Sequence, residues 1–390
     1  MGACIGLSSG QRCMIAMPGM LSTSLLAPLL RRRAALLAAA GSLLSGCVAE
    51  YAPPGPAMRV ADVETDAFVM PDGMRLPYRA WLPVQGWAVQ GRAVQGRAVQ
   101  GWDGVAPWAV VLALHGFNDS RDAWEIPAPA LAASGIAVYA PDQRGFGATM
   151  VRGRWPGADA LADDAAAMAR LLRRRHPRAK LVLAGESMGG AVLMHLATRG
   201  GGPHLAGDGG ALPVDGYMLL APAVWGRASM NVFMQGGLWL VATLLPGLTV
   251  SRPPPGVRII ASDNNDALRR LSRNPLTVRA TRFDTLRGLV DLMDLALAAA
   301  PRFPQVPALF LYGANDMIIP AAATRAIWSA LPGGVVRRSF YQQGYHLLPR
   351  DLGRAVPIAD IVAWIRNPAA PLPSGGEAAA ARWVAGSPAV

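Results

Sequence analysis

The stretch Leu181–Gly190, LVLAGESMGG, decides the fold of this 390-residue chain. An apolar run leads into GESMG (185–189), and a helical pattern continues from there to Thr198. A serine between two glycines at such a strand-to-helix turn is typical of a nucleophile elbow, because side chains at the glycine positions would collide with the neighbouring strand and helix. The segment therefore predicts a sheet strand that ends at a reactive Ser187.

The sequence on both sides of this turn alternates between apolar runs and helical patterns. Continuous apolar runs predict strands that are covered on both faces: Trp108–Leu114, Ile136–Ala140, Leu181–Ala184, Tyr217–Leu220, Ala308–Tyr312 and Val335–Tyr341. Helical stretches separate most of them: Ala158–His176, Met188–Thr198, Ala321–Leu331 and Ala355–Ile365. Two further strand-like runs, Asp62–Met70 and Met74–Leu82, precede them and are joined by a turn at Pro71-Asp72-Gly73. The predicted fold class is α/β, with a mostly parallel, doubly wound sheet.

One long interval interrupts this alternation. No sheet strand is recognisable between Pro222 and Pro307, and such a length is far beyond an ordinary connection. We expect a helical cap at 222–306, with helices at Gly237–Leu245, Asn264–Arg273 and Phe283–Ala300. Within it, Met230–Leu248 is rich in Met and aromatic residues and almost uncharged. That composition fits a lipid-facing lid and equally a segment that packs on the main domain.

The N-terminus has the pattern of an export signal. In residues 31–47, RRRAALLAAAGSLLSGC, three arginines precede an apolar segment that is too short to span a bilayer. The ending LSGC (44–47) resembles the lipobox of bacterial lipoproteins, which implies cleavage before Cys47 and acylation of its thiol. We therefore expect a signal peptide at 1–46 and a membrane anchor at Cys47, in the bacterial cell envelope. Val48, rather than Asp, favours by resemblance the outer membrane facing the periplasm.

Alternatives to this interpretation of the N-terminus stay open. One is an ordinary signal peptide in which Cys47 is incidental, and another is a twin-arginine signal at Arg32-Arg33, whose flanking residues match poorly. The segment before Met20 is unusual for an export signal, which points to a translation start at Met17 or Met20.

The remaining segments divide the chain further. The Pro-rich residues 50–57, EYAPPGPA, predict a segment that is neither helical nor paired in a sheet, within a tether at 47–61. The repeat GWAVQ-GRAVQ-GRAVQ-GWDG (86–104) has a period that matches neither a helix nor a strand, so we expect a surface insertion loop. The core is expected at 62–221 and 307–366, and a tail at 367–390.

Composition excludes several other classes of protein. With 52% apolar and 16% charged residues, the chain is not intrinsically disordered. Its formal charge of +12 comes from scattered arginines and a single lysine, without a basic stripe, so nucleic acid is not an expected partner. All 3 cysteines lie in the first 47 residues, which leaves no disulfide or Cys/His zinc spacing beyond them. No metal or organic cofactor is expected.

A serine nucleophile needs a base within hydrogen-bond reach, and elbow-type enzymes place nucleophile, acid and histidine in that order along the chain. His346 is the histidine that follows the last predicted strand, and it is the predicted base. The stretch LFLYGAND (309–316) is a strand followed by a loop with Asp316, the predicted orienting acid. Asp291 and Asp294 compete for this role, but their spacing in a helical stretch is typical of a solvated face.

Two backbone N–H groups are expected to stabilise the developing oxyanion. One belongs to Met188, directly after the nucleophile, and the other to Phe117 in the loop HGF (115–117) after the first central strand. We expect His115 to brace this loop.

Five motifs in order resemble the α/β-hydrolase superfamily: HGFNDS (115–120), PDQRGFG (141–147), GESMGG (185–190), GANDMIIP (313–320) and GYH (344–346). Within it, the chain from Asp62 to Arg366 resembles the group of monoacylglycerol lipases, lysophospholipases and serine aminopeptidases. The resemblance implies an α/β-hydrolase fold with a cap and a serine hydrolase that cleaves carboxylic esters, above all those of acyl lipids. Glu186 departs from the group, whose lipases often have histidine there. A serine aminopeptidase-like peptidase, with Glu186 or cap acids holding the substrate amine, is the alternative, and a non-catalytic envelope lipoprotein is another.

Overall fold

The computed structural model describes residues 48–83, 106–199, 212–251 and 259–386. The stretch Cys47–Val390 is one compact unit. The expected signal peptide (1–46), the predicted anchor Cys47 and the repeat 86–104 lie outside the described residues.

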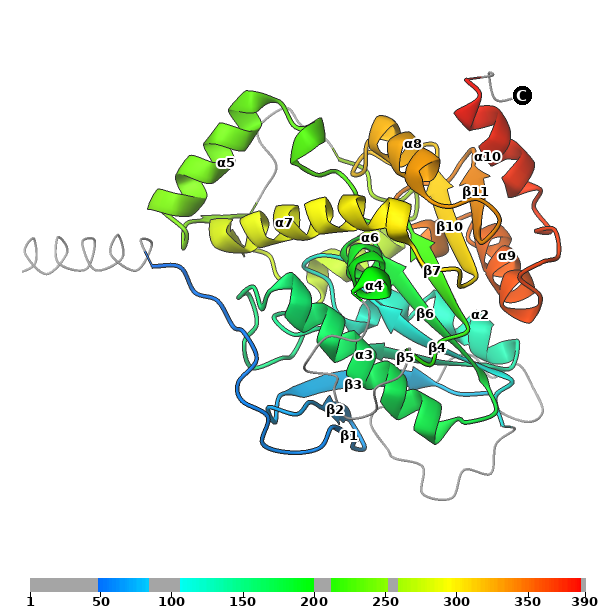
Figure 1. The fold of residues 1–390 in the computed structure, drawn as a ribbon, viewed down its shortest axis with the longest axis horizontal. Coiled ribbons are helices and arrows are strands. Elements are labelled where there is room, and N and C mark those ends of the chain that lie inside the picture. The colour runs from blue at the N-terminus through cyan, green and yellow to red at the C-terminus, as the bar shows by residue number, and fades with distance from the viewer. Residues whose placement is uncertain (1–47, 84–105, 200–211, 252–258, 387–390) are drawn as a thin grey trace, which may run out of the picture. The chain divides into compact units, whose positions relative to one another are not determined.

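In the described part of the chain, nine strands form the central sheet, in the order β1-β2-β3-β5-β4-β6-β7-β10-β11 (Figure 1). Their bounds are β1 (Asp62–Val63), β2 (Ala67–Val69), β3 (Arg75–Trp81), β4 (Ala109–Leu114), β5 (Ile136–Pro141), β6 (Lys180–Glu186), β7 (Gly216–Leu220), β10 (Ala308–Gly313) and β11 (Val336–Tyr341). The strands from β5 to β11 in this order are parallel, and β1, β2 and β3 add an antiparallel edge. The predicted fold class is confirmed.

Helices cover both faces of the sheet because the central strands are apolar on both sides. Along β4, Val110, Leu112 and Leu114 pack on one face. Ala109, Val111 and Ala113 pack on the other. The first face carries α3 (Ala158–Arg175), α4 (Met188–Thr198), α8 (Ala321–Ala330) and α10 (Gly376–Val384), and the second carries α2 (Pro127–Ala133) and α9 (Ala355–Arg366).

The interval after β7 contains the three expected helices, α5 (Val232–Leu244), α6 (Asn265–Arg273) and α7 (Phe283–Ala299). Helix α5 begins five residues before the prediction, because the Asn231 side chain caps it by accepting a hydrogen bond from the Met234 N–H at 2.9 Å. The strands β8 (Thr249–Val250) and β9 (Thr281–Arg282) form an antiparallel pair apart from the central sheet. No helix in the described ranges has the length and apolar content to span a bilayer.

Two expectations for the N-terminal part were wrong. The run Asp62–Met70 is not one strand but two, β1 and β2, because the Glu64 N–H donates to the Ala67 carbonyl at 2.9 Å and closes a turn between them. The expected tether also pairs locally: Tyr51 forms a β-bridge with Trp155, and the Ala52 N–H donates to the Trp155 carbonyl at 3.0 Å. The prolines that prevent pairing begin only at Pro53, after this bridge.

The expected tail at 367–390 contains a helix that packs on the sheet. Trp383 of α10 stacks on Phe340 of β11, with ring centroids 4.8 Å apart. Glu377, at the start of α10, pairs with Arg337 of β11. The folded unit therefore extends through α10, since an aromatic stack and an ion pair hold this helix on the edge of the sheet.

Candidate active site

Ser187 lies at a sharp turn between β6 and α4. Its φ of 51° is in a region that residues with a Cβ rarely adopt. Neighbouring backbone fixes the turn, because the Ser187 N–H donates to the Leu220 carbonyl and the Ala223 N–H donates to the Ser187 carbonyl, both at 2.9 Å. A Cβ at Gly189 would lie 2.7 Å from the Leu114 carbonyl oxygen. This turn therefore has the strained, closely packed geometry of a nucleophile elbow.

His346 and Asp316 form a buried pair on the loops after β11 and β10. The His346 Nδ1 is 2.8 Å from the Asp316 Oδ2. The other oxygen of Asp316 accepts hydrogen bonds from the N–H groups of Ile318 (2.8 Å) and Ile319 (2.9 Å). Because these bonds fix the carboxylate, Asp316 determines the orientation of the imidazole ring.

The structure brings Ser187 and His346 to the same cavity. No hydrogen bond joins the two side chains, and such contacts are often loose before substrate binds. The two aspartates that competed with Asp316 in the sequence lie elsewhere: Asp291 and Asp294 both pair with Arg227.

The loop after β4 lies directly against the elbow. Parallel pairing sets Leu114 of β4 opposite Gly185 of β6, and a Cβ at Gly116 would lie 3.3 Å from the Ser187 Cβ. Among the described residues, the backbone N–H groups of Phe117 and Met188 have no acceptor. These two N–H groups, which the sequence singled out, are therefore available to a ligand at Ser187.

His115 holds this loop in place. Its Nε2 accepts a hydrogen bond from the Gln143 N–H at 3.0 Å, so its Nδ1 donates to the Gly116 carbonyl at 2.7 Å. The Gln143 side chain in turn donates to the His115 carbonyl at 2.8 Å. Burial lowers the pKa of His115, which keeps the ring neutral in this arrangement. The bracing role expected from the sequence fits these contacts.

The cavity that contains Ser187 and His346 has a volume of about 810 Å³ and an apolar lining. Its walls come from the core and from the cap, and the apolar side chains from the cap include Trp225, Met230, Met234, Leu238, Leu286, Leu289, Val290 and Met293. Its size falls within the range of pockets that enclose small organic ligands.

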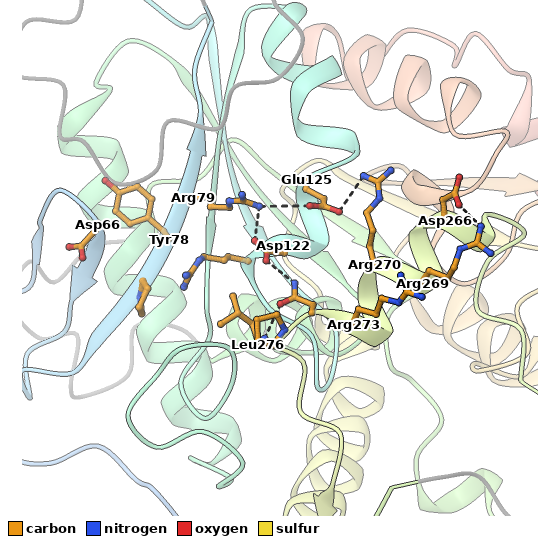
Figure 2. A pocket seen from close by; sticks show the side chains of 14 residues that line it. Asp66, Tyr78, Arg79, Asp122, Glu125, Asp266, Arg269, Arg270, Arg273 and Leu276 are labelled. Atoms are coloured by element: carbon orange, nitrogen blue, oxygen red, sulfur yellow. Dashed lines mark hydrogen bonds and ion pairs between the residues drawn. The ribbon is translucent and has the colours of Figure 1, made fainter.

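A second, larger cavity of about 1150 Å³ is charged and lies between β3, the turn Arg121–Trp124 and α6. Figure 2 shows arginines of this cavity that face acidic side chains: Arg79 is 2.7 Å from Asp122, and Arg270 is 3.6 Å from Glu125. Neither Ser187 nor His346 lines this cavity. Among the described residues, no group of three His, Cys, Asp or Glu side chains could hold a metal ion. The apolar cavity is therefore the candidate active site.

The sequence analysis assigned no role to two charged residues at this site, Asp119 and Arg350. The Glu186 carboxylate, considered there as a holder of a substrate amine, accepts a hydrogen bond from Arg350 at 2.5 Å. The same guanidinium nitrogen is 2.7 Å from the Asp119 Oδ2. Asp119 lay in a recognised motif, HGFNDS, whereas the only signal for Arg350 was its position four residues after His346.

Comparison with known proteins places the chain in a family. The model of the family described as serine aminopeptidase, S33, matches residues 105–353, more than half of the chain. A monoacylglycerol lipase of Mycolicibacterium smegmatis is 23% identical over 268 residues, which are 66% of this chain and 88% of that protein.

Solved structures show the same fold. The monoacylglycerol lipase of Paleococcus ferrophilus has a TM-score of 0.55 at 21% identity, covering 74% of this chain and 98% of that one. A soluble variant of the monoglyceride lipase of Saccharomyces cerevisiae has a TM-score of 0.58 at 17% identity, covering 82% and 98%. The chain belongs to the serine aminopeptidase S33 family of α/β-hydrolases.

Proposed function

We propose that this protein is a serine hydrolase that cleaves carboxylic esters of acyl lipids, with monoacylglycerols or lysophospholipids as the substrate class. One observation carries the proposal: Ser187 and His346, which is paired with Asp316, line an apolar cavity of about 810 Å³. The names of the relatives, monoacylglycerol lipase and monoglyceride lipase, point to the same chemistry.

In the proposed reaction, the Ser187 hydroxyl attacks the ester carbonyl carbon while the His346 Nε2 takes its proton. The Asp316 carboxylate, hydrogen-bonded to Nδ1, stabilises the imidazolium that forms. The backbone N–H groups of Phe117 and Met188 donate to the oxyanion. The imidazolium then protonates the leaving alcohol, and an acyl-enzyme remains on Ser187. Water then attacks this ester while His346 takes its proton, and the imidazolium returns the proton to the Ser187 oxygen as the fatty acid leaves.

The cavity lining supports an acyl chain as the group bound there. Apolar surface that leaves water on binding contributes roughly 25 cal/mol per Å². Cap helix α5 also exposes apolar side chains on the outside: Phe233 is 85% and Trp239 is 60% exposed. Exposed apolar surface of this kind is typical of contact with a membrane or another protein. A lipid substrate accounts for both features.

The site does not favour an aminopeptidase. An aminopeptidase needs a free carboxylate to hold the substrate ammonium group, and both candidates beside Ser187, Glu186 and Asp119, already pair with Arg350. A non-catalytic role gives no reason for a strained serine beside a buried His–Asp pair.

The proposal includes a lipid anchor on Cys47 in the bacterial envelope, at the outer membrane facing the periplasm. In support, the first described residues lie against the cap: the Val48 carbonyl accepts a hydrogen bond from Arg282 at 2.9 Å, and the Glu50 N–H donates to Asp284 at 3.1 Å. An anchor just before Val48 therefore keeps the start of α7 near the membrane. The wild-type protein should incorporate a labelled fatty acid and Cys47→Ser should not, and equal labelling of both, or labelling of neither, would contradict the anchor.

The activity is tested with protein that begins at Val48 and with monoacylglycerols and lysophospholipids of increasing chain length. Release of fatty acid should increase with acyl length and disappear in Ser187→Ala. Hydrolysis of short soluble esters only would contradict lipid specificity, and hydrolysis of aminoacyl amides only would favour the peptidase. Silence on all of these would leave the non-catalytic alternative.

A further inference from the structure

Arg350 lies at the end of the 3₁₀ turn Leu348–Arg350, in the loop that carries His346. Its side chain is buried, and one guanidinium nitrogen contacts the Glu186 carboxylate at 2.5 Å and the Asp119 carboxylate at 2.7 Å. These three residues are far apart in sequence: Glu186 ends β6, and Asp119 belongs to the loop after β4. One buried cation therefore connects three loops.

Each of these loops carries one part of the proposed catalytic machinery. Glu186 directly precedes Ser187, Asp119 is two residues after Phe117, and Arg350 is four residues after His346. The contact between the loops is close, because a Cβ at Gly116 would lie 3.5 Å from the Glu186 Oε1. The Glu186 carboxylate therefore packs against the loop that carries Phe117.

We propose that Arg350 is a positioning residue, which aligns the nucleophile, the oxyanion loop and the histidine loop by holding the carboxylates of Glu186 and Asp119. This inference rests on the proposed function, since it assigns Ser187, Phe117 and His346 their catalytic roles.

Electrostatics explain why the three loops depend on this one side chain. Two carboxylates are buried beside the cavity, and burial raises the pKa of Glu186 whereas the positive charge of Arg350 lowers it. The Arg350 backbone is also fixed, because its carbonyl accepts a hydrogen bond from the Asn264 side chain at 2.8 Å. Without the guanidinium, Glu186 and Asp119 repel each other, and the two loops separate or one carboxylate takes up a proton.

The chain offers a matched control in Arg144. Its guanidinium is as buried as that of Arg350 and also joins two carboxylates, Asp164 at 2.8 Å and Asp72 at 2.6 Å. Those partners lie on α3 and in the turn before β3, and neither lines the catalytic cavity. Arg144→Met therefore also leaves two buried carboxylates unpaired and should lower the free energy of unfolding by a similar amount. It leaves the contacts of Glu186 and Asp119 intact.

The test measures kcat and KM of the full-length protein for p-nitrophenyl butyrate, together with the rate at which a fluorophosphonate labels Ser187. Arg350→Met should lower kcat and the labelling rate about 100-fold, with KM changed less than about threefold, because a loop shift near 1 Å misaligns the reacting groups. Arg350→Lys, which keeps the positive charge, should have a kcat and a labelling rate about tenfold higher than those of Arg350→Met. Arg144→Met should lower the melting temperature but keep kcat within about threefold of wild type.

Each outcome decides a different question. An equal loss of kcat in Arg144→Met and Arg350→Met, at equal loss of melting temperature, would show a purely structural role and overturn the inference. Unchanged labelling and kcat in Arg350→Met would also overturn it. If Arg350→Met does not fold, Arg350→Lys and Glu186→Gln replace it, and unchanged kcat in both would reject the inference. A wild-type protein that neither labels nor hydrolyses esters would instead reject the proposed function.

Discussion

Helices α4 and α5 are two apolar helices in opposite environments. Their sequences, MGGAVLMHLAT and VFMQGGLWLVATL, both contain a Gly-Gly pair, methionine and leucine, and neither has an acidic residue. In α4 every residue from Met188 to Leu196 is buried, whereas in α5 only Ala242 is. Composition alone does not distinguish them; their position in the fold does.

This difference in burial corresponds to two proposed roles: α4 supports the nucleophile, and α5 contacts the substrate. Helix α4 begins directly after Ser187 and packs against α3, α7 and the sheet, so it holds the proposed nucleophile rigidly. Helix α5 lines the cavity with Met234 and Leu238 and exposes its other side. Exposing apolar surface of this kind to water is unfavourable in free energy, and contact with lipid removes this penalty. We therefore expect substitutions in the first turn of α4 to reduce activity or stability, and substitutions on the exposed side of α5 to change only hydrolysis at lipid surfaces.

The largest expected effect on activity distinguishes two histidines, His346 and His195, each of which pairs with an aspartate. His195 of α4 is 2.8 Å from Asp159, as His346 is from Asp316, but His195 does not line the cavity. His346→Ala should lower kcat/KM for soluble esters about 10⁴-fold, because the general base is lost. His195→Ala should change it less than about twofold. A comparable loss in both variants would contradict the assignment of His346.

The next effect concerns the folded state of α4. Gly189→Ala places a Cβ 2.7 Å from the Leu114 carbonyl oxygen and 2.9 Å from the His115 carbonyl oxygen. Both contacts are with backbone, which cannot move without disturbing β4 and the loop after it. We expect a loss of about 3 kcal/mol in the free energy of unfolding, measured by urea denaturation. A variant of wild-type stability would show that the elbow is looser than the structure indicates.

A smaller effect is expected on the exposed side of α5. Replacing Phe233 and Trp239 together by serine removes two exposed aromatic side chains without opening the core. Hydrolysis of long-chain monoacylglycerol in vesicles should fall about tenfold, since each aromatic ring contributes apolar contact with lipid, whereas hydrolysis of p-nitrophenyl butyrate stays unchanged. Equal losses on both substrates would mean that α5 supports the site rather than the surface contact.

The same contrast explains how much of the molecule could be predicted from sequence. The core strands and α4 follow from continuous apolar runs and from the GESMG turn, because burial on both faces leaves a local pattern. Asp316 and His346 follow from chain order, since each comes just after a strand. Arg350 did not follow, because its partners are 164 and 231 positions away and no local pattern records such a contact.

The exposure of α5 was likewise left open by the sequence, since an apolar helix has the same pattern whether protein or lipid covers it. Helix α10 was missed for a related reason. Its contacts are aromatic stacking and an ion pair with β11, which depend on the position of the sheet edge rather than on the residues next to it.

Partial burial of His176, at the C-terminal end of α3, makes this end of the helix sensitive to acid, whereas α5 contains no titratable residue. Burial lowers the pKa of His176 to about 4, and its ring is 2.9 Å from the Tyr139 hydroxyl. In the unfolded chain the pKa is about 6.5, so the unfolded state binds a proton that the folded state does not. Stability should therefore decrease as the pH falls from 6.5 to 4. His176→Gln should reduce this loss in the free energy of unfolding by about 1 kcal/mol. The effect is small because the imidazole is partly exposed and water screens its charge. Identical pH profiles of melting temperature in both proteins would contradict this.

The smallest effect completes the comparison between the two Gly-Gly pairs. A Cβ at Gly236 of α5 meets nothing within 4 Å, in contrast to the 2.7 Å contact at Gly189 of α4. Alanine is favoured over glycine inside a helix by about 1 kcal/mol, because glycine loses more backbone entropy on folding. Gly236→Ala should therefore slow hydrogen exchange of the α5 amides about threefold to fivefold, with no change in urea denaturation of the core. Faster exchange would show that alanine at this position destabilises α5. The helix would then depend on the flexibility of its glycines, and its exposed apolar side would belong to a helix that rearranges.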